Sequence, residues 1–215
     1  MVNTFVSAVI LAAGKSTRFP GNKMLKEIML GGIKAPIIRH TVRKFLNSGG
    51  VDEVVVVLGH EKEKIMNVLS DLEVKFVISR NYEEGMSYSV KAGVKAVMKY
   101  ADVAAIHPGD VPFILPSTLE TLLNRARKEY GKGKEFIIIP RYKPLNKGGH
   151  PLIIGGGLLP YVMDISEEGR GLKSFLNRFR DRIIYIETDD LGVLADIDRP
   201  EDLERDKELI ERESL

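Results

Sequence analysis

The chain has 215 residues, of which 44% are hydrophobic and 29% are charged, and its formal net charge is +2. This length is typical of one domain with a substantial core, and the composition excludes a wholly disordered or collagen-like protein. No apolar run approaches the roughly 18 residues that cross a bilayer, and no basic segment precedes the first run, so we expect neither a membrane span nor a signal peptide. Cysteine is absent, which excludes disulfides and fits a reducing compartment, and we therefore expect a cytoplasmic protein.

Short apolar runs rich in β-branched residues alternate along the chain with stretches of helical period. The runs predict strands at 5–11, 53–58, 74–78, 103–107, 135–140 and 183–186. The periodic stretches predict helices at 36–46, 62–72, 87–100, 117–128 and 200–212. A further run at 150–154 is expected as a strand on the margin of the sheet or in a small flap.

Strands that are buried on both faces and separated by helices indicate βαβ units in a mainly parallel sheet. We therefore predict an α/β fold with three layers, a Rossmann-like and mostly parallel sheet that carries helices on both faces. The chain shows no repeat and no long linker, so residues 1–215 are expected to form a single domain. Such a sheet binds its ligands at the carboxyl ends of the strands, which directs attention to the loops that follow them.

The net charge of +2 hides an uneven distribution. Residues 1–51 hold eight Lys or Arg and one Glu, so this segment carries +7 and the remainder of the chain carries −5. The basic end attracts anions, and the acidic end is a source of cation ligands or a solvated helix. Nucleic acid is not the expected partner, because the basic segment has neither an aromatic-rich surface signature nor a recognition-helix motif.

The first predicted strand runs directly into a loop of small and basic residues, Leu11-Ala12-Ala13-Gly14-Lys15-Ser16-Thr17-Arg18. Small side chains let the backbone turn closely around a ligand, and successive N–H groups in such a turn form an anion-binding concavity. Lys15, Arg18 and Lys23 add charge that can reach phosphate oxygens. A tight strand exit with solvated bases is the alternative. The loop is not a Walker A motif, because Val9 stands where that motif has its first glycine, and no G-x-G-x-x-G follows the strand.

A second candidate segment precedes the helix predicted at 87–100. Gly85 permits close approach of the backbone, and Ser87 or Ser89 can cap the helix. The N–H groups at a helix N-terminus suit an anion or a base carbonyl. A capped helix without any ligand is the alternative.

Carboxylates suited to Mg²⁺ occur in two places. Asp110 leaves a buried strand in the turn Pro108-Gly109-Asp110-Val111-Pro112, although a plain turn residue would satisfy the same pattern. Asp196 and Asp198 alternate in an extended segment, so both can face one ion. The alternative for Asp198 is to cap the last predicted helix.

In chain order these segments resemble the signatures of the molybdenum cofactor nucleotidyltransferase family, whose fold is GT-A-like. The first loop resembles L-A-[AG]-G-x-S-x-R-x-G-x-x-K, with Pro20 in place of the second glycine. Segment 81–93 resembles an Asn followed by G-M-x-x-S-[LV]-x-x-G, and segment 108–112 resembles G-D-x-P. Segment 196–203 resembles D-[IV]-D-T-P-E-D-L, with Arg199 in place of Thr.

Two further segments resemble the family's elements near the acceptor less closely. Segment 146–151 resembles G-x-x-G-[HN]-P, with Asn146 in place of the first glycine, and segment 168–173 resembles the G-x-R that opens the next helix. The resemblance implies that His150 and Arg170 contact the acceptor, and Lys173, which stands at the spacing of the family's Arg, is the other candidate for the second contact. A structural histidine and a surface charge are the alternatives.

The resemblance implies a Mg²⁺-dependent nucleotidyltransferase that transfers CMP from CTP to the phosphate of molybdopterin and releases pyrophosphate. CTP is implied because the loop reads Leu-Ala-Ala-Gly, as in the cytidylyl branch, rather than Leu-Ala-Gly-Gly. Backbone N–H groups of 13–17, with Arg18 and Lys23, would hold the triphosphate, and Asp110 with Asp196 or Asp198 would hold Mg²⁺. Alternatives are a guanylyltransferase, a sugar- or alditol-phosphate nucleotidyltransferase, or a regulatory protein that binds nucleotide without turnover. The partners implied are small molecules, with no nucleic acid or membrane, and docking of a molybdoenzyme or chaperone stays open.

Overall fold

The computed structural model of the chain describes residues 4–206 and 208–209. A twisted sheet runs through the centre in the order β10-β7-β9-β6-β1-β4-β5, and β8 pairs with β7 beside this path. The parallel strands are β1 (Val6–Ala12), β4 (Glu53–Leu58), β5 (Lys75–Ile78), β6 (Val103–Pro108), β7 (Ile137–Tyr142) and β10 (Ile183–Thr188). The predicted α/β fold with a mostly parallel sheet is confirmed, and every strand expected from a Val- or Ile-rich run is present.

The position of strand β9 (Leu152–Gly155) corrects an expectation. It lies between β6 and β7 and is antiparallel to both, rather than on the margin of the sheet or in a flap. All four of its residues are buried, because helices or turns cover both faces of the sheet at this point. The two-residue strand β8 (Lys147–Gly148) precedes it and folds back antiparallel onto the end of β7.

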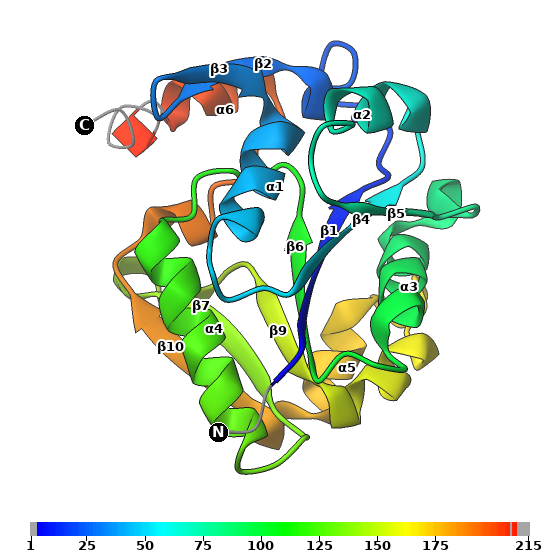
Figure 1. Cartoon of the computed structure of the whole chain (residues 1–215), viewed down its shortest axis with the longest axis vertical. Coiled ribbons are helices and arrows are strands. Elements are labelled where there is room, and N and C mark those ends of the chain that lie inside the picture. Colours follow the sequence, from blue (N-terminus) through cyan, green and yellow to red (C-terminus); the bar gives the residue numbers. More distant parts are fainter. Residues whose placement is uncertain (1–3, 207, 210–215) are drawn as a thin grey trace.

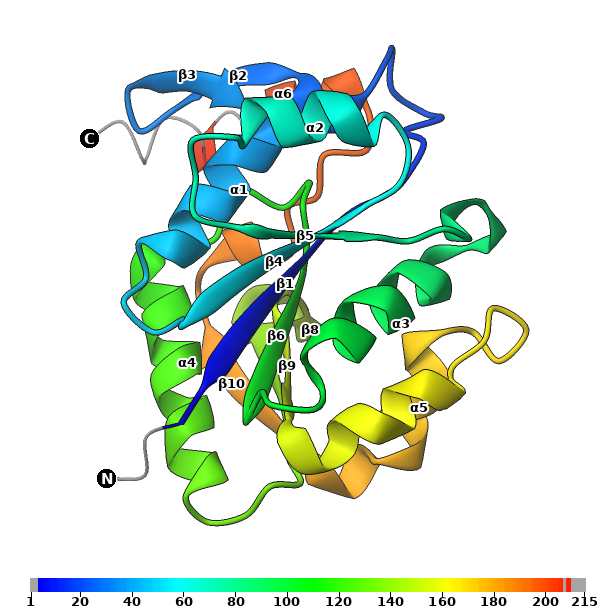
Figure 2. The same cartoon turned by 45° about the vertical axis from the view of Figure 1, so that its right-hand side comes forward.

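Helices cover both faces of the sheet (Figure 2). One face packs against α1 (Ile37–Leu46), α2 (Lys62–Val68) and α4 (Pro116–Tyr130), and the other against α3 (Met86–Val97), a 3₁₀ segment at Gly156–Asp164 and α5 (Leu172–Arg178). Strand alternation assigns the side chains, so that Ala8 and Ile10 face the first group and Val9 faces the second. Helix α3 approaches β1 closely at Gly93, where a Cβ atom would lie 2.4 Å from Val9 Cγ1.

A hairpin that the sequence did not predict joins the two ends of the chain. Strands β2 (Glu27–Leu30) and β3 (Ile33–Pro36) pair antiparallel and lie beside α6 (Pro200–Arg205) (Figure 1). A third apolar cluster joins Phe19 and Ile28 from the first part of the chain to Ala195 and Ile197 from the last part. This contact places the first loop next to the segment 194–198.

Several helices differ from their expected limits. Helix α2 ends at Val68, four residues early, and the 3₁₀ segment was not expected. Helix α5 begins within segment 168–173, where the resemblance implied the opening of a helix. Helix α6 ends at Arg205, and part of the helix expected over 200–212 lies outside the described residues. Among the residues that are described, no helix is long and apolar enough to cross a membrane.

Candidate functional site

A cavity of about 510 Å³ lies at the carboxyl ends of β1 and β6. It gathers most of the predicted site residues, which come from separate parts of the chain. These are Leu11, Ala13, Gly14, Ser16, Thr17, Arg18, Lys23, Gly85, Ser89, Asp110, His150, Asp196 and Asp198.

Four predicted residues do not line this cavity. Ala12 is fully buried at the end of β1, and the Lys15 ammonium forms an ion pair with the Glu83 carboxylate at 2.9 Å. Ser87 is buried inside α3, and Arg170 is exposed in the loop before α5. The cavity is therefore lined by most of the residues expected to bind the triphosphate and by all three carboxylates expected to bind the metal. Of the two residues expected to contact the acceptor, only His150 lines it.

The first loop is fixed by its own backbone and by Ser16. Ser16 adopts a left-handed conformation (φ 55°), and its carbonyl accepts a hydrogen bond from the Phe19 N–H at 2.9 Å. Its hydroxyl oxygen accepts one from the Lys23 N–H at 3.2 Å. Asn22 caps the following 3₁₀ turn, because its side-chain oxygen accepts from the Met24 N–H at 3.0 Å. These contacts set the position of Lys23 relative to the glycine loop.

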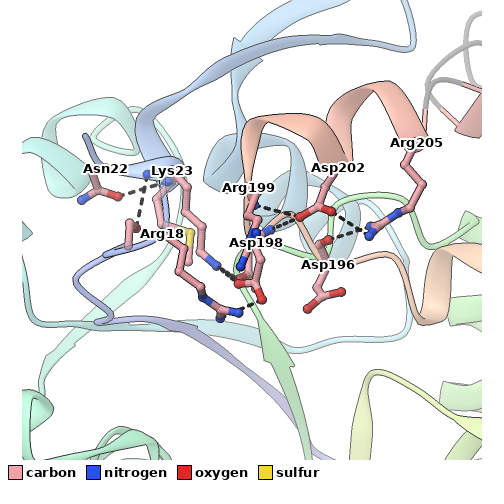
Figure 3. A network of polar contacts seen from close by, with 11 residues as sticks. Arg18, Asn22, Lys23, Asp196, Asp198, Arg199, Asp202 and Arg205 are labelled. Atoms are coloured by element: carbon pink, nitrogen blue, oxygen red, sulfur yellow. Dashed lines mark hydrogen bonds and ion pairs between the residues drawn. The ribbon is translucent and has the colours of Figure 1, made fainter. Parts of the chain in front are cut away.

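The side chains of Lys23 and Arg18 extend toward the Asp198 carboxylate (Figure 3), and Lys23 also contacts the carboxylate of Asp110. The Lys23 ammonium contacts the Asp110 carboxylate and lies 2.8 Å from Asp198 Oδ1, and Arg18 Nη2 lies 2.7 Å from Asp198 Oδ2. The Lys23 side chain is only 13% exposed. Burial lowers the pKa of Lys23, but the Asp110 and Asp198 carboxylates outweigh burial, so the pKa is raised and the ammonium stays charged.

The turn that carries Asp110 is held from three sides. The Thr41 hydroxyl donates to the Gly109 carbonyl at 2.8 Å, and the Ile197 N–H donates to the Asp110 carbonyl at 3.0 Å. His107 Nε2 lies 2.8 Å from the Val111 carbonyl oxygen, inside the core. Burial lowers the pKa of His107 to about 3, so the ring is neutral and its Nε2 proton is the one that the carbonyl accepts.

In the acidic segment near the C-terminus, one aspartate caps helix α6 and another faces the cavity. The Asp202 carboxylate accepts hydrogen bonds from the N–H groups of Asp198 (2.7 Å) and Arg199 (2.8 Å) at the start of α6. Asp202, rather than Asp198, therefore caps this helix, and the Asp198 side chain is directed to Lys23 and Arg18. Burial, together with the carboxylates of Asp198 and Asp110, raises the pKa of Asp196.

Whether these carboxylates suit a metal ion can be judged from their geometry. Within residues 4–206 and 208–209, no group of three or more His, Cys, Asp or Glu side chains is placed to hold a metal. Asp110 and Asp198 nevertheless converge on one cation, the Lys23 ammonium, with Asp196 in the same cavity. Two converging carboxylates with a third nearby fit a divalent ion if the ammonium moves aside.

The formal charges that line the cavity cancel. Three cationic side chains, Arg18, Lys23 and Lys147, face three carboxylates, Asp110, Asp196 and Asp198. His150 also lines the cavity, and burial lowers the pKa of its ring, which favours the neutral form. The lining alone thus has no net charge to offset a polyanion.

The N-terminus of α3 is capped differently from the expectation. Its N-cap is Gly85, which has no side chain, and Ser87 and Ser89 lie within the helix. The Glu167 carboxylate accepts hydrogen bonds from the Ser87 N–H at 2.6 Å and from the Ser87 hydroxyl. These two bonds lower the pKa of Glu167. The Glu167 carboxylate, 80 residues away in the chain, thus occupies the helix N-terminus at which the sequence predicted a ligand.

Sequence reasoning missed several residues that line the cavity. Tyr82 and the exposed Met86 flank Gly85 on one wall, and Lys147 and Gly148 of β8 contribute another. Nothing in the pattern of the sequence signals a two-residue strand. Lys147 does lie inside the segment that resembles G-x-x-G-[HN]-P, which was the available signal.

Comparison with known protein families gives one broad match. The profile of the family described as "MobA-like NTP transferase domain" matches residues 8–183 of the chain. The match includes the first loop, Gly85, Asp110 and His150, and ends before Asp196.

Curated relatives are similar over part of the chain. The bifunctional protein GlmU of Geotalea uraniireducens is 29% identical over 126 residues, 58% of this chain and 27% of that protein. A probable molybdenum cofactor guanylyltransferase of Thermococcus sibiricus is 29% identical over 136 residues, 63% of this chain and 61% of that protein. The 2-C-methyl-D-erythritol 4-phosphate cytidylyltransferase of Clostridium acetobutylicum is 33% identical over 129 residues, 58% of this chain and 54% of that protein. The chain therefore covers about a quarter of the GlmU protein and less than two thirds of the other two.

Two solved structures resemble the fold over nearly its whole length. A Methanothermobacter nucleotidyl transferase is 24% identical, with a TM-score of 0.77 and coverage of 97% of this chain and 98% of that one. A protein from Mycobacterium tuberculosis H37Rv, solved in complex with manganese, is 20% identical, with a TM-score of 0.75 and coverage of 97% and 99%. At these identities the likeness concerns the fold alone.

Proposed function

The chain belongs to the MobA-like NTP transferase domain family, and we propose that it is a nucleotidyltransferase that transfers CMP from CTP to the phosphate of a molybdopterin-type acceptor. The observation that carries this proposal is the convergence of Lys23 and Arg18 on Asp110 and Asp198 in a cavity at the carboxyl ends of the strands. The two groups that nucleotidyl transfer requires, cations for phosphates and carboxylates for a metal, meet there.

The proposed reaction is a displacement at phosphorus. An oxygen of the acceptor phosphate forms a bond to the α-phosphorus of CTP, the bond from that phosphorus to the bridging oxygen breaks, and pyrophosphate leaves with the electron pair. The N–H groups of loop 13–17, with Arg18 and Lys23, would hold the triphosphate and offset the charge that develops on pyrophosphate. The nucleophile is already an anion, so the reaction needs no general base.

A divalent cation, which we take to be Mg²⁺, forms part of the proposal. A nucleoside triphosphate brings several negative charges into a cavity whose lining is neutral, so the lining alone cannot balance the substrate. Asp110 together with Asp198 or Asp196 would hold the ion, which when bound would offset the negative charge of the triphosphate and make the α-phosphorus more electrophilic. Lys23 would then leave the carboxylates and turn to the triphosphate.

The choice of CTP depends on Ala13, which lines the cavity. Its methyl group leaves less space for the base than a glycine would, which disfavours a purine. One methyl group discriminates between two ligands by about 1–3 kcal/mol. GTP is the second candidate, because the Thermococcus relative is named as a guanylyltransferase.

A direct assay separates these possibilities. The chain is incubated with Mg²⁺, each of the four nucleoside triphosphates and one of three acceptors: molybdopterin, 2-C-methyl-D-erythritol 4-phosphate or a hexosamine 1-phosphate. We expect pyrophosphate release with CTP and molybdopterin, and its loss in Asp110→Asn. Pyrophosphate release with GTP instead of CTP would identify the chain as a guanylyltransferase. Nucleotide binding without pyrophosphate from any pair would overturn the enzyme and leave a regulatory binding protein.

A further inference from the structure

Lys147 is a cation in the cavity that has no carboxylate partner among residues 4–206 and 208–209. Its side chain is exposed and lines the cavity from β8, and within the described part of the chain it forms neither an ion pair nor a side-chain hydrogen bond. The other two cations of the lining are engaged, Arg18 with Asp198 and Lys23 with Asp110 and Asp198. Lys147 is therefore the cation that can meet an incoming anion without first breaking a contact.

The backbone of Lys147 is nonetheless held in place. Lys147 pairs with Tyr142 across the β7–β8 ladder, and the Gly149 N–H donates to the Pro140 carbonyl at 2.8 Å. A defined backbone that carries an unpaired ammonium is suited to ligand recognition, because ordering the side chain on binding costs only its own rotamer freedom.

The sheet order sets the position of Lys147 across the cavity. The triphosphate loop follows β1, Asp110 follows β6, and β8 lies on β7, with β9 between β6 and β7. Strand β10 occupies one edge of β7 along its whole length, so β8 pairs with the other edge, in line with β9. Two strand spacings of about 4.8 Å separate that line from β1, so Lys147 lies about 10 Å from the triphosphate loop at the level of the sheet. Asp110 lies between them.

This order matches the geometry of displacement at phosphorus. The attacking and leaving oxygens lie roughly in line on opposite sides of the phosphorus. With pyrophosphate held by the first loop and the α-phosphorus near Asp110, the attacking group arrives from the side of β7. His150 on that side is favoured in its neutral form, and Arg170 lies outside the cavity, so neither supplies a ready positive charge there.

We propose that Lys147 binds the negatively charged group of the acceptor. This inference rests on the proposed function, and it assigns the acceptor side of the cavity to the β7–β8 hairpin. Lys147 would hold the nucleophilic group in line with the α-phosphorus and lower the repulsion between two anions.

The test compares Lys147→Gln with a matched lysine on the same hairpin. Lys143 is paired with Asp189 at 2.8 Å and does not line the cavity, so Lys143→Gln controls for the loss of one positive charge nearby. Lys147→Arg restores the charge. Phenyl phosphate, benzoate and benzyl alcohol serve as dianionic, monoanionic and neutral probes, and their binding is measured by ligand-observed NMR.

Each protein is titrated both free and loaded with Mg²⁺ and the α,β-methylene analogue of CTP or GTP, which cannot transfer its nucleotide. We expect phenyl phosphate or benzoate, but not benzyl alcohol, to bind the loaded wild type, with the stronger anion identifying the acceptor chemistry. Lys147→Gln is expected to weaken that binding by about tenfold, as the loss of a charged hydrogen bond does, while Lys147→Arg and Lys143→Gln retain it.

Equal anion binding by Lys147→Gln and wild type, or no anion binding by either loaded protein, would overturn the assignment. Affinity for the nucleotide analogue is recorded in the same series and reports on the proposed function separately. Loss of nucleotide binding in the wild type would contradict the proposed function, whereas unchanged nucleotide binding with unchanged anion binding in Lys147→Gln would contradict only the role of Lys147.

Discussion

Lys23 brings together carboxylates that lie 87 and 175 residues away in the chain. Its ammonium lies between Asp110 and Asp198 and is largely shielded from water, so it offsets repulsion between two carboxylates that share one cavity. The same ammonium is the one proposed to meet the triphosphate. The Lys23 ammonium therefore cannot both neutralise the two carboxylates and bind the triphosphate. A divalent cation that took its place between the carboxylates would free it for the triphosphate.

Lys23→Met keeps the length of the side chain and removes its charge. We expect turnover to fall by at least about 100-fold, as it does when a preorganised charge contact to the transition state is lost. We also expect a lower Tm at pH 7, because Asp110 and Asp198 lose their shared cation, and a larger rise of Tm with Mg²⁺ than in the wild type. Lys26→Met, three residues on and outside the cavity, is the control. Wild-type activity in Lys23→Met would remove this residue from the site.

Burial, with the carboxylates of Asp198 and Asp110, raises the pKa of Asp196 and so stabilises its protonated form. An acid whose pKa is raised on folding binds its proton more tightly when folded, so stability falls as the pH rises from about 3.9 through the raised value. Asp196→Asn should therefore raise the Tm at pH 7 and diminish stabilisation by Mg²⁺. Asp198→Asn should lower the Tm, because Arg18 loses its carboxylate and Lys23 keeps only that of Asp110. Thermal melts at pH 7 with and without Mg²⁺ test both, and a lower Tm in Asp196→Asn would contradict the argument.

At the scale of elements, the ends of helices show where local rules are overridden by distant groups. Helix α3 begins at Gly85 with no cap of its own, and Glu167 provides one from the loop before α5. Lys91, further along α3, donates to the Ile165 carbonyl at 3.0 Å, so the same loop is attached to the helix at two points. The wall of the cavity formed by Gly85 and Met86 therefore depends on residues 165–167.

Glu167→Ala removes this cap. We expect a loss of about 0.5–1 kcal/mol, at the lower end for capping groups because Glu167 is exposed, and hence a fall in Tm of about 1–4 °C. Glu168→Ala, the next residue, with no hydrogen bond or ion pair in the described part of the chain, should leave the Tm unchanged. Because the folded pKa of Glu167 is lowered, its contribution is present above the ordinary carboxyl pKa and disappears as the pH falls through the lowered value. Equal Tm values for the two variants between pH 5 and 7 would contradict this role.

Elements were predictable where burial alone determines them. Each Val- and Ile-rich run became a strand, and runs buried on both faces, such as those of β4 and β7, fit only interior strands of a covered sheet. Strand β9 has the same composition, yet its antiparallel place between β6 and β7 follows from the chain reversal at β8, which local pattern does not encode. The β2–β3 hairpin was missed because its strands are only four residues long, and β2 contributes two buried side chains, Ile28 and Leu30, to the third apolar cluster.

The positions of those site residues that directly follow a strand could be predicted from the sequence pattern, and the positions of those further from a strand end could not. The first loop and Asp110 follow β1 and β6, which are neighbours in the sheet, so their proximity is a consequence of topology. Asp198 reaches them only because the third apolar cluster holds segment 194–198 against the first loop. Lys147 lies on a two-residue strand and Arg170 in a loop, and charge in the sequence gives no direction to either side chain. Arg170, which was expected at the acceptor, lies outside the cavity, and Lys147, for which no role was expected, lines it.

At the scale of the whole molecule, the cavity joins segments from five separate stretches of the chain, so a ligand in it stabilises the fold as a unit. Its neutral lining makes that stabilisation conditional on a cation, since a triphosphate alone would face Asp110, Asp196 and Asp198. We therefore expect Mg²⁺ with CTP or GTP, at 100 times its dissociation constant, to stabilise the protein by about 2.7 kcal/mol and to raise the Tm by about 5–10 °C. The same nucleotide in EDTA should give a much smaller rise, and Asp110→Asn should abolish the difference between the two conditions. Equal stabilisation with and without Mg²⁺ would show that Arg18, Lys23 and the loop N–H groups balance the triphosphate unaided, and the carboxylates would then need another purpose.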